Sequence, residues 1–214
     1  MGAAVFGGSF DPVHVGHLHV ADSALAIPWV ERVYMVPAGR PPHKSLSGGA
    51  SAAQRLSMVT RSVSMRPEIT VLDWELLAAE TSYTYPTVTR LMNELPNGER
   101  IGLIVGTDLL LRFTSWKNWE DLLSVVTLLL TRHPEGTDPR EFAESGDCVT
   151  APDALRKAIR EAEVIEHVWL PVSSTLIRDR VRAHARCRDL VPPGAWTVIE
   201  QEGLYGYGES HSGW

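Results

Sequence analysis

The sequence predicts an α/β fold of the Rossmann-like, doubly wound class: a mainly parallel sheet with helices on both faces. Apolar, β-rich runs recur along the chain, and each is followed by a helical pattern, which is typical of parallel sheets. The first run, Ala3–Phe6, ends at Gly7 and Gly8, which allow a tight turn. The 214 residues, 44% hydrophobic and 21% charged, are enough for one buried core. We expect a single domain over residues 1–203 and a loosely held tail over 204–214.

The elements follow from this alternation, with boundaries good to about 2–4 residues. Ligands of such sheets bind beyond the carboxyl ends of the strands, where the strand order reverses, so the end of the first strand is a candidate site. Strands are predicted at residues 3–6, 33–36, 69–72, 101–105, 125–130 and 164–170. Helices are predicted near residues 15–26, 51–65, 86–95, 107–112, 152–162 and 174–184.

Two polar connections interrupt the pattern. Residues 37–50 are rich in Pro, Gly and Ser and have no periodic apolar face, so we expect a loop that closes beside the site as a lid. Residues 133–151 also contain several prolines and glycines. We interpret this second stretch as a surface loop without chemistry.

Composition excludes several classes of protein. The formal net charge of −6 argues against a broad nucleic-acid surface, which needs clustered Lys and Arg. No apolar run approaches the ~18 residues of a membrane span, and the first residues lack a basic leader. Cys148 and Cys187 have no metal-ligand spacing. We therefore expect a cytoplasmic protein that binds neither nucleic acid nor membrane.

Two imidazoles, those of His14 and His17, flank Gly16 directly after the first strand. We expect a helix to start there with both imidazoles in its first turn, where unpaired N–H groups and the helix dipole favour anions. This arrangement suits a polyphosphate. The pair could instead simply cap the helix, or bind a metal with nearby His19, although the nearest carboxylates show no zinc spacing.

A second candidate anion site lies near the other end of the chain. Ser173, Ser174 and Thr175 end a strand-like run and open a helix, and they offer hydroxyls and free amides. Arg178 follows one turn later on the face of Ser174. The alternative interpretation is an ordinary helix cap with a surface arginine.

Together the two blocks resemble a known family. The run Gly7-Gly8-Ser9-Phe10-Asp11-Pro12-Val13-His14-Val15-Gly16-His17 is similar to the HxGH signature of the nucleotidylyltransferase superfamily, in its bacterial nicotinate-nucleotide form. Val172-Ser173-Ser174-Thr175-Leu176-Ile177-Arg178 resembles the ISSTxIR signature of the same family. The resemblance covers residues 3 to about 203. It implies transfer of the adenylyl group of ATP to nicotinate mononucleotide, giving deamido-NAD and pyrophosphate, with Mg²⁺ held through the ATP phosphates and no protein metal site.

Further stretches resemble the acceptor side of that family. Pro41-Pro42-His43-Lys44 resembles a PxHK loop whose lysine approaches the substrate phosphate, although a solvated lysine is the alternative. Ser82-Tyr83-Thr84 resembles an SYT segment that contacts the base carboxylate, but Pro86 departs from the expected residue type and suits a first helical turn. Trp116-Lys117-Asn118-Trp119 resembles a WxxW segment, which makes Trp116 the candidate wall for a pyridine ring, although at least one indole should be simple core.

Two stretches resemble the adenosine side of the family. Gly106-Thr107-Asp108 resembles its GxD element, in which a carboxylate at a strand end accepts ribose hydroxyls, and the same residues could also cap a helix. Arg132-His133-Pro134 resembles an RPG-like strand end beside the adenine, but His133 intrudes and we assign it no role.

By resemblance, His17, with His14 and Arg178, stabilises the transferring charge. The expected ATP-binding residues are Gly8, His14, His17, Gly106, Asp108, Ser174, Thr175 and Arg178. The expected residues for nicotinate mononucleotide are Ser9, Phe10, Lys44, Thr84, Tyr85 and Trp116.

Four questions stay open at this level. The acceptor could be phosphopantetheine or a cytidylyl acceptor, although Trp116 and Ser82-Tyr83-Thr84 disfavour both. The chain could also be a nucleotide sensor without turnover. The preference between nicotinate and nicotinamide depends on loop geometry, and a homo-oligomer is as compatible with the sequence as a monomer.

Overall fold

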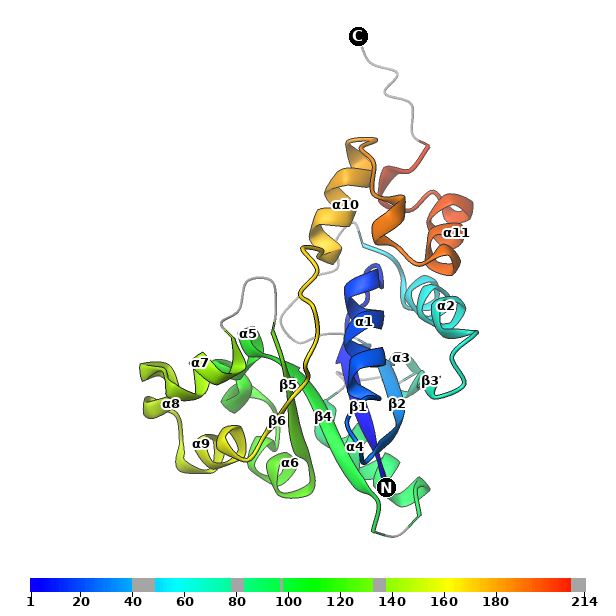
Figure 1. Ribbon diagram of the computed structural model, residues 1–214. Helices are drawn as coiled ribbons and strands as arrows, with labels where there is room; N and C mark the ends of the chain where they lie inside the picture. Colours follow the sequence, from blue (N-terminus) through cyan, green and yellow to red (C-terminus); the bar gives the residue numbers. More distant parts are fainter. Residues whose placement is uncertain (40–48, 78–82, 97, 133–137, 209–214) are drawn as a thin grey trace.

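The computed structural model describes residues 1–39, 49–77, 83–96, 98–132 and 138–208. In this part of the chain six strands form one parallel sheet in the order β3-β2-β1-β4-β5-β6 (Figure 1). The order reverses between β1 and β4, which confirms the predicted doubly wound α/β class. The strands are β1 (Gly2–Gly8), β2 (Val30–Pro37), β3 (Ile69–Val71), β4 (Arg100–Gly106), β5 (Thr127–Thr131) and β6 (Glu163–Val164).

The central strand is buried on both sides. Ala4 of β1 belongs to the core on one face of the sheet, whereas Ala3 and Val5 belong to the core on the other. All three residues are at most 1% exposed. Because side chains alternate along a strand and both faces are covered, β1 is an unbroken apolar run.

Helices cover both faces, as predicted. One core includes Met58 and Ile177 and lies under α1, α2, α10 and α11; the other includes Val88 and Leu122 and lies under the remaining helices. No helix of the described residues is long and apolar enough to cross a membrane. The α-helices are α1 (Val15–Ala24), α2 (Ala52–Val63), α3 (Trp74–Leu77), α4 (Thr84–Glu94), α5 (Thr107–Leu110), α6 (Trp119–Val125), α7 (Pro139–Glu144), α8 (Gly146–Thr150), α9 (Asp153–Arg160), α10 (Ser174–Arg182) and α11 (Pro193–Glu202). The 3₁₀ turns are η1 (Phe113–Ser115), η2 (Arg188–Leu190) and η3 (Leu204–Gly206).

The sixth strand is much shorter than predicted. The Ile165 amide still donates to the Leu130 carbonyl at 2.9 Å, but β5 ends at Thr131 and offers no further pairing partner. Beyond that point the chain leaves the sheet, and Val168 is 72% exposed. The apolar run 164–170 predicts a strand over its full length, but in the structure β6 ends at Val164, close to the point where β5 ends.

The prediction of a surface loop over 133–151 is wrong for its described part. Two short helices, α7 and α8, occupy most of residues 138–151. Phe142 and Cys148 are 5% and 1% exposed and pack into the second core. Asp138 and Ser145 cap these helices with their side chains, so the polar residues that suggested a loop are helix caps.

The end of the chain is also more ordered than predicted. Helix α11 was not among the expected helices, because the Pro-Pro-Gly run at its start is more typical of a turn. In the structure Pro193 occupies the first turn of α11, where its missing N–H costs nothing. Leu204 and Tyr205 are 8% and 6% exposed. A loosely held tail therefore does not begin at residue 204.

Close packing of α11 on α2 leads to a stability prediction. A Cβ added to Gly194 would lie 2.5 Å from the Arg61 backbone carbonyl oxygen, so Gly194→Ala forces the two helices apart. We expect it to lower the free energy of unfolding by about 1–3 kcal/mol in urea denaturation. Gly146→Ala is the matched control, because nothing lies within 4 Å of its added Cβ. An unchanged midpoint for Gly194→Ala would contradict the tight α2–α11 contact.

Candidate active site

The turn between β1 and α1 has a buried underside. Phe10 adopts a positive φ of 47°, which is uncommon for a residue with a side chain. The residue is 1% exposed, and its ring packs edge-on against the rings of Phe6 and His17, at centroid distances of 5.6 and 5.0 Å. Phe10 therefore supports His17 from below.

The two histidines cap the helix and each other. The sequence predicts both histidines in the first turn of α1. His17 is there, as the third helical residue, but His14 is the N-cap. The His17 amide donates to His14 Nδ1 at 3.3 Å, and the His14 amide donates to His17 Nδ1 at 3.2 Å. Their rings stack at 3.6 Å. Because both Nδ1 atoms accept, the neutral rings carry their protons on Nε2, so both are Nε2–H donors.

Helix capping and anion binding are therefore compatible here. The two histidines do cap the helix, as the capping alternative predicted. The same hydrogen bonds leave the Nε2–H of each neutral ring as the donor that an anion site requires. The absence of a side chain at Gly16 leaves room for the same arrangement. A Cβ at residue 16 would lie 3.1 Å from His14 Nδ1 and 3.0 Å from Val172 Cγ1, so a larger residue would press on the imidazole.

The second block lies directly against this turn. Arg178 Nη1 donates to the Asp11 carbonyl at 2.7 Å, and Ser174 Oγ donates to the Pro12 carbonyl at 2.9 Å. Arg178 Nη2 also donates to Thr175 Oγ1 at 3.2 Å. Figure 1 shows α10 above the start of α1. Residues more than 160 positions apart in the chain thus form one cluster at the carboxyl end of β1.

The hydroxyls of the second block have different tasks. Ser173 is the N-cap of α10 and accepts from the Leu176 amide at 3.1 Å, so the capping interpretation is correct for this residue. Ser174 holds the β1–α1 turn, as described above. Thr175 is exposed, and its hydroxyl accepts from Arg178. The exposed Thr175 is therefore the hydroxyl of this block best placed to meet a ligand from solvent.

A buried charged group beneath the turn was missed by the sequence analysis. Asp11 is 4% exposed, and its Oδ1 accepts from the Ala50 amide at 2.9 Å and the Tyr205 hydroxyl at 2.7 Å. Arg55, 1% exposed, donates to the carbonyls of Ser9 at 2.8 Å and Gly39 at 3.2 Å. Burial lowers the pKa of Arg55, and the nearby Asp11 carboxylate opposes that shift.

One feature of the sequence indicates that Arg55 is buried. Arg55 lies on the inward face of an amphipathic helix, one turn before the buried apolar residues Met58 and Val59. A charged residue at such a position is almost never buried without a partner. Its partners come from segments remote in sequence, so the sequence alone could not name them.

The GxD element lies on the strand next to β1. Gly106 ends β4 and precedes α5, whose second residue is Asp108. Because β1 and β4 pair in parallel, with Val5 opposite Leu103, their carboxyl ends lie side by side. Asp108 is half-buried at this edge. The structure thus brings Gly106 and Asp108 to the same edge of the sheet as the histidines.

Three of the expected acceptor residues, Thr84, Tyr85 and Trp116, belong to segments that lie together on the other side of the sheet. Trp116 is half-buried and its ring stacks on Phe113, which is fully buried, at 4.9 Å. Lys117 Nζ lies 4.8 Å from the Tyr83 ring centroid, so the start of α4 and the Trp116 segment are neighbours. Thr84 and Tyr85 are the first residues of α4. Pro86 lies in the first turn of this helix, as predicted.

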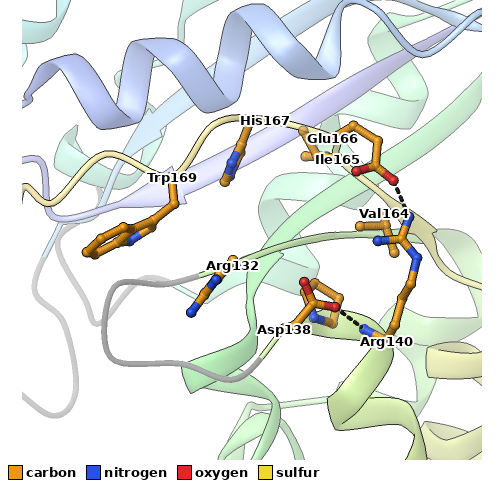
Figure 2. A pocket seen from close by; sticks show the side chains of 9 residues that line it. Arg132, Asp138, Arg140, Val164, Ile165, Glu166, His167 and Trp169 are labelled. Carbon is orange, nitrogen blue, oxygen red and sulfur yellow. Dashed lines mark hydrogen bonds and ion pairs between the residues drawn. The ribbon is translucent and has the colours of Figure 1, made fainter.

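A cavity of about 150 Å³ opens beyond β5 and β6 (Figure 2). Arg132 and Trp169 lie at the same end of this cavity, with the Arg132 guanidinium 5.9 Å from the indole ring centroid. Arg140 pairs with Glu166, and its amide donates to Asp138 at 2.9 Å. The cavity therefore has a positive side at Arg132 and a neutralised side at Arg140.

Of the remaining expected residues, Gly8 and Ser9 lie at the end of β1 and in the turn that follows it. Gly8 ends β1, and a Cβ there would lie 3.0 Å from the Phe10 ring. Ser9 is half-buried and uses its carbonyl to hold Arg55. Lys44 and Ser82 lie outside the described residues, as does most of the segment expected to act as a lid.

Comparison with known proteins identifies the family. A model of the cytidylyltransferase-like family matches residues 5–180. The chain is 32% identical to the nicotinate-nucleotide adenylyltransferase of Salmonella typhimurium, over 94% of this chain and 97% of that one. It is 31% identical to the probable nicotinate-nucleotide adenylyltransferase of Acidithiobacillus ferrooxidans, over 94% of each chain. This chain belongs to the nicotinate-nucleotide adenylyltransferases of the cytidylyltransferase-like family.

Solved structures support the fold of this family member. The Plasmodium falciparum nicotinic acid mononucleotide adenylyltransferase complexed with NaAD superposes with a TM-score of 0.75 at 19% identity, covering 98% of this chain and 99% of that one. A putative nicotinate-nucleotide adenylyltransferase from Vibrio parahaemolyticus gives 0.63 at 17% identity, with 96% of each chain covered. At these identities the likeness concerns the fold.

Proposed function

We propose that this adenylyltransferase transfers the adenylyl group of ATP to nicotinate mononucleotide, giving deamido-NAD and pyrophosphate. The observation that carries this proposal is the direct contact between the two signature blocks. Arg178 and Ser174 hold the two carbonyls that precede the histidine pair. These contacts bring the segment that carries Arg178 and Thr175 next to the turn that carries the histidine pair. Imidazole, guanidinium and hydroxyl donors of this kind suit the phosphates of a nucleoside triphosphate.

The transfer needs no covalent enzyme intermediate. The 5′-phosphate of the mononucleotide attacks the α-phosphorus of ATP, a new P–O bond forms, and the bond to the β-phosphate oxygen breaks. The nucleophile is already anionic at neutral pH, so a strong general base is unnecessary. We assign His14, His17 and Arg178 to stabilise charge on the transferring and leaving groups.

The ATP side also includes the strand ends. We assign Gly8 and Gly106 to close backbone approach, Asp108 to the ribose hydroxyls, and Ser174 and Thr175 to the phosphate side. Asp108 supports this because it lies at the carboxyl edge of β4, next to β1.

Mg²⁺ fits this site as a partner of the nucleotide. Within the described ranges, no group of three or more His, Cys, Asp or Glu side chains is placed to hold a metal. The Asp11 carboxylate accepts from Ala50 and Tyr205. The residues assigned to the phosphates are hydrogen-bond donors, which bind phosphate oxygens, so the metal would be carried on the triphosphate, where it offsets negative charge.

The acceptor side is assigned to Ser9, Phe10, Lys44, Thr84, Tyr85 and Trp116. Trp116 supports nicotinate most directly, since its indole is a flat apolar wall already held in place by Phe113. The contact between Lys117 and the Tyr83 ring places the start of α4, with Thr84 and Tyr85, next to the Trp116 segment.

Removing the Trp116 wall should weaken acceptor binding selectively. We expect Trp116→Ala to raise KM for nicotinate mononucleotide by roughly fivefold to tenfold, about 1–1.4 kcal/mol, and to leave KM for ATP unchanged. Trp116→Phe keeps an aromatic face and should restore most of the affinity. Steady-state kinetics with each substrate varied in turn decides the matter. Equal changes in both KM values would remove Trp116 from the acceptor site.

An acceptor panel tests the function itself. Purified protein is incubated with ATP, Mg²⁺ and, in parallel, nicotinate mononucleotide, nicotinamide mononucleotide or phosphopantetheine, and pyrophosphate is quantified. We expect the fastest release with nicotinate mononucleotide. Faster release with phosphopantetheine, or with CTP in place of ATP, would reassign the substrate. No release with any acceptor would favour the nucleotide-sensing alternative.

The cellular setting is a further part of the proposal. Cys148 and Cys187 are both free and buried, which supports work in a reducing compartment, the cytoplasm. ATP and nicotinate mononucleotide are the proposed partners, with no role for nucleic acid or membrane. A homo-oligomer stays a hypothesis that sedimentation can test.

A further inference from the structure

The β1–α1 turn is held from beneath by a residue far outside the signature blocks. Tyr205 lies in η3, after α11, and beyond the residues 5–180 that the family model matches. Its φ is 59°, and Gly203 before it has a φ of 58°, so the chain reverses direction at the end of α11. This reversal brings the Tyr205 ring into the first core.

The Tyr205 hydroxyl has one defined task in the structure. It donates to Asp11 Oδ1 at 2.7 Å, and both residues are buried, with exposures of 6% and 4%. Burial, together with the Asp11 carboxylate, raises the pKa of Tyr205 far above its ordinary value, so the hydroxyl remains a donor at every working pH. A buried hydrogen bond to a charged group is strong and fixes both partners.

Asp11 passes this restraint to the histidines. Its carbonyl is held by Arg178, its side chain by Tyr205 and Ala50, and His14 follows three residues later. The reciprocal His14–His17 hydrogen bonds require His14 to keep its extended N-cap backbone, with φ −139° and ψ 170°. A turn that shifts at Asp11 will not present His14 at the same place.

We propose that Tyr205 is a positioning residue, which acts through Asp11 to hold His14 and His17 in the mutually capped geometry in which both rings carry the proton on Nε2. This inference rests on the proposed function for its effect on turnover. Its effect on the histidine tautomers is independent of any activity.

The test variant is Tyr205→Phe, which removes only the hydroxyl and keeps the ring that fills the core. Tyr207→Phe is the matched control, because the Tyr207 hydroxyl donates to Glu200 Oε1 at 3.1 Å within the C-terminal segment. We expect Tyr205→Phe to lower kcat by about tenfold to a hundredfold, since small displacements of catalytic groups are costly, and to change both KM values less than about twofold. Tyr207→Phe should behave as the parent.

The second readout is the protonation pattern of the imidazoles, from long-range ¹H–¹⁵N spectra of the full chain at pH 8 without substrate. We expect the Nε2–H form for His14 and His17 in the parent and in Tyr207→Phe, and a mixture of tautomers in Tyr205→Phe. The His184 signals should not change.

Three results would overturn the proposal. The first is a parent-like histidine pattern in Tyr205→Phe, whatever its activity, because the hydroxyl would then not control the pair. The second is an equal loss of kcat in Tyr207→Phe, which would mark general destabilisation. The third is an altered pattern with unchanged kcat, which would separate the tautomers from turnover. A parent enzyme without turnover would refute the proposed function but leave the tautomer test intact.

Discussion

His17→Ala is expected to lower kcat by about 10²–10³-fold, equivalent to ~3–4 kcal/mol of lost transition-state stabilisation. The imidazole is held by the His14 amide on Nδ1 and by the edge contact with Phe10, so its Nε2–H donor is preorganised. Alanine removes that donor, and solvent cannot replace it without reorganisation. Pyrophosphate release at saturating ATP and nicotinate mononucleotide measures the loss.

This variant also loses a helix cap, and the two effects must be separated. We expect His17→Ala to cost about 1 kcal/mol of folding free energy, because the His14 amide loses its acceptor. His17→Gln is the control, since a glutamine at this helix position can accept from the N-cap amide as in a capping box. Stability should return in His17→Gln while turnover stays low. Recovery of turnover together with stability would mean that His17 is a structural cap only.

Arg178→Ala should produce the second largest loss. The guanidinium donates to the Asp11 carbonyl and to Thr175, and in the proposed function its charge also faces the phosphates. We expect kcat/KM for ATP to fall by about 10²–10³-fold. Arg178→Lys should recover less than about tenfold, because an ammonium cannot reproduce the planar fork that reaches both partners.

Arg182→Ala is the matched control on the same helix. Arg182 pairs with Asp179 at 3.0 Å on the exposed side of α10, where such pairs contribute about 0–1 kcal/mol. We expect its kinetics to equal those of the parent. Comparable losses in Arg178→Ala and Arg182→Ala would indicate that α10 as a whole had been disturbed.

Much of the fold was predictable because its signals are local. The runs at β1, β2 and β4 are apolar since both faces of the sheet are covered, and the turn glycines follow β1 directly. Prediction failed where contacts with residues distant in sequence determine the secondary structure. The run after Ile165 has strand character, but β5 ends at Thr131 and the run leaves the sheet. Helices α7 and α8 form where Phe142 and Cys148 pack into the second core.

The residues that carry the chemistry of the site were predictable from the sequence, whereas the buried residues that hold the β1–α1 turn in place were not. His14, His17 and Arg178 could be named from two signatures, but the structure adds that the first two cap each other. Asp11, Arg55 and Tyr205 could not be connected from sequence. Their contacts join residues separated by up to 194 positions, and no spacing rule encodes such pairs.

The most direct test of the central claim is a crystal structure of the protein with Mg²⁺ and a non-hydrolysable ATP analogue. The account predicts the phosphates between the Nε2 atoms of His14 and His17 and the Arg178 guanidinium, all within hydrogen-bonding distance. It would be contradicted by an analogue whose phosphates lie elsewhere, for example in the cavity beside Arg132, with the histidine pair and Arg178 touching no phosphate oxygen.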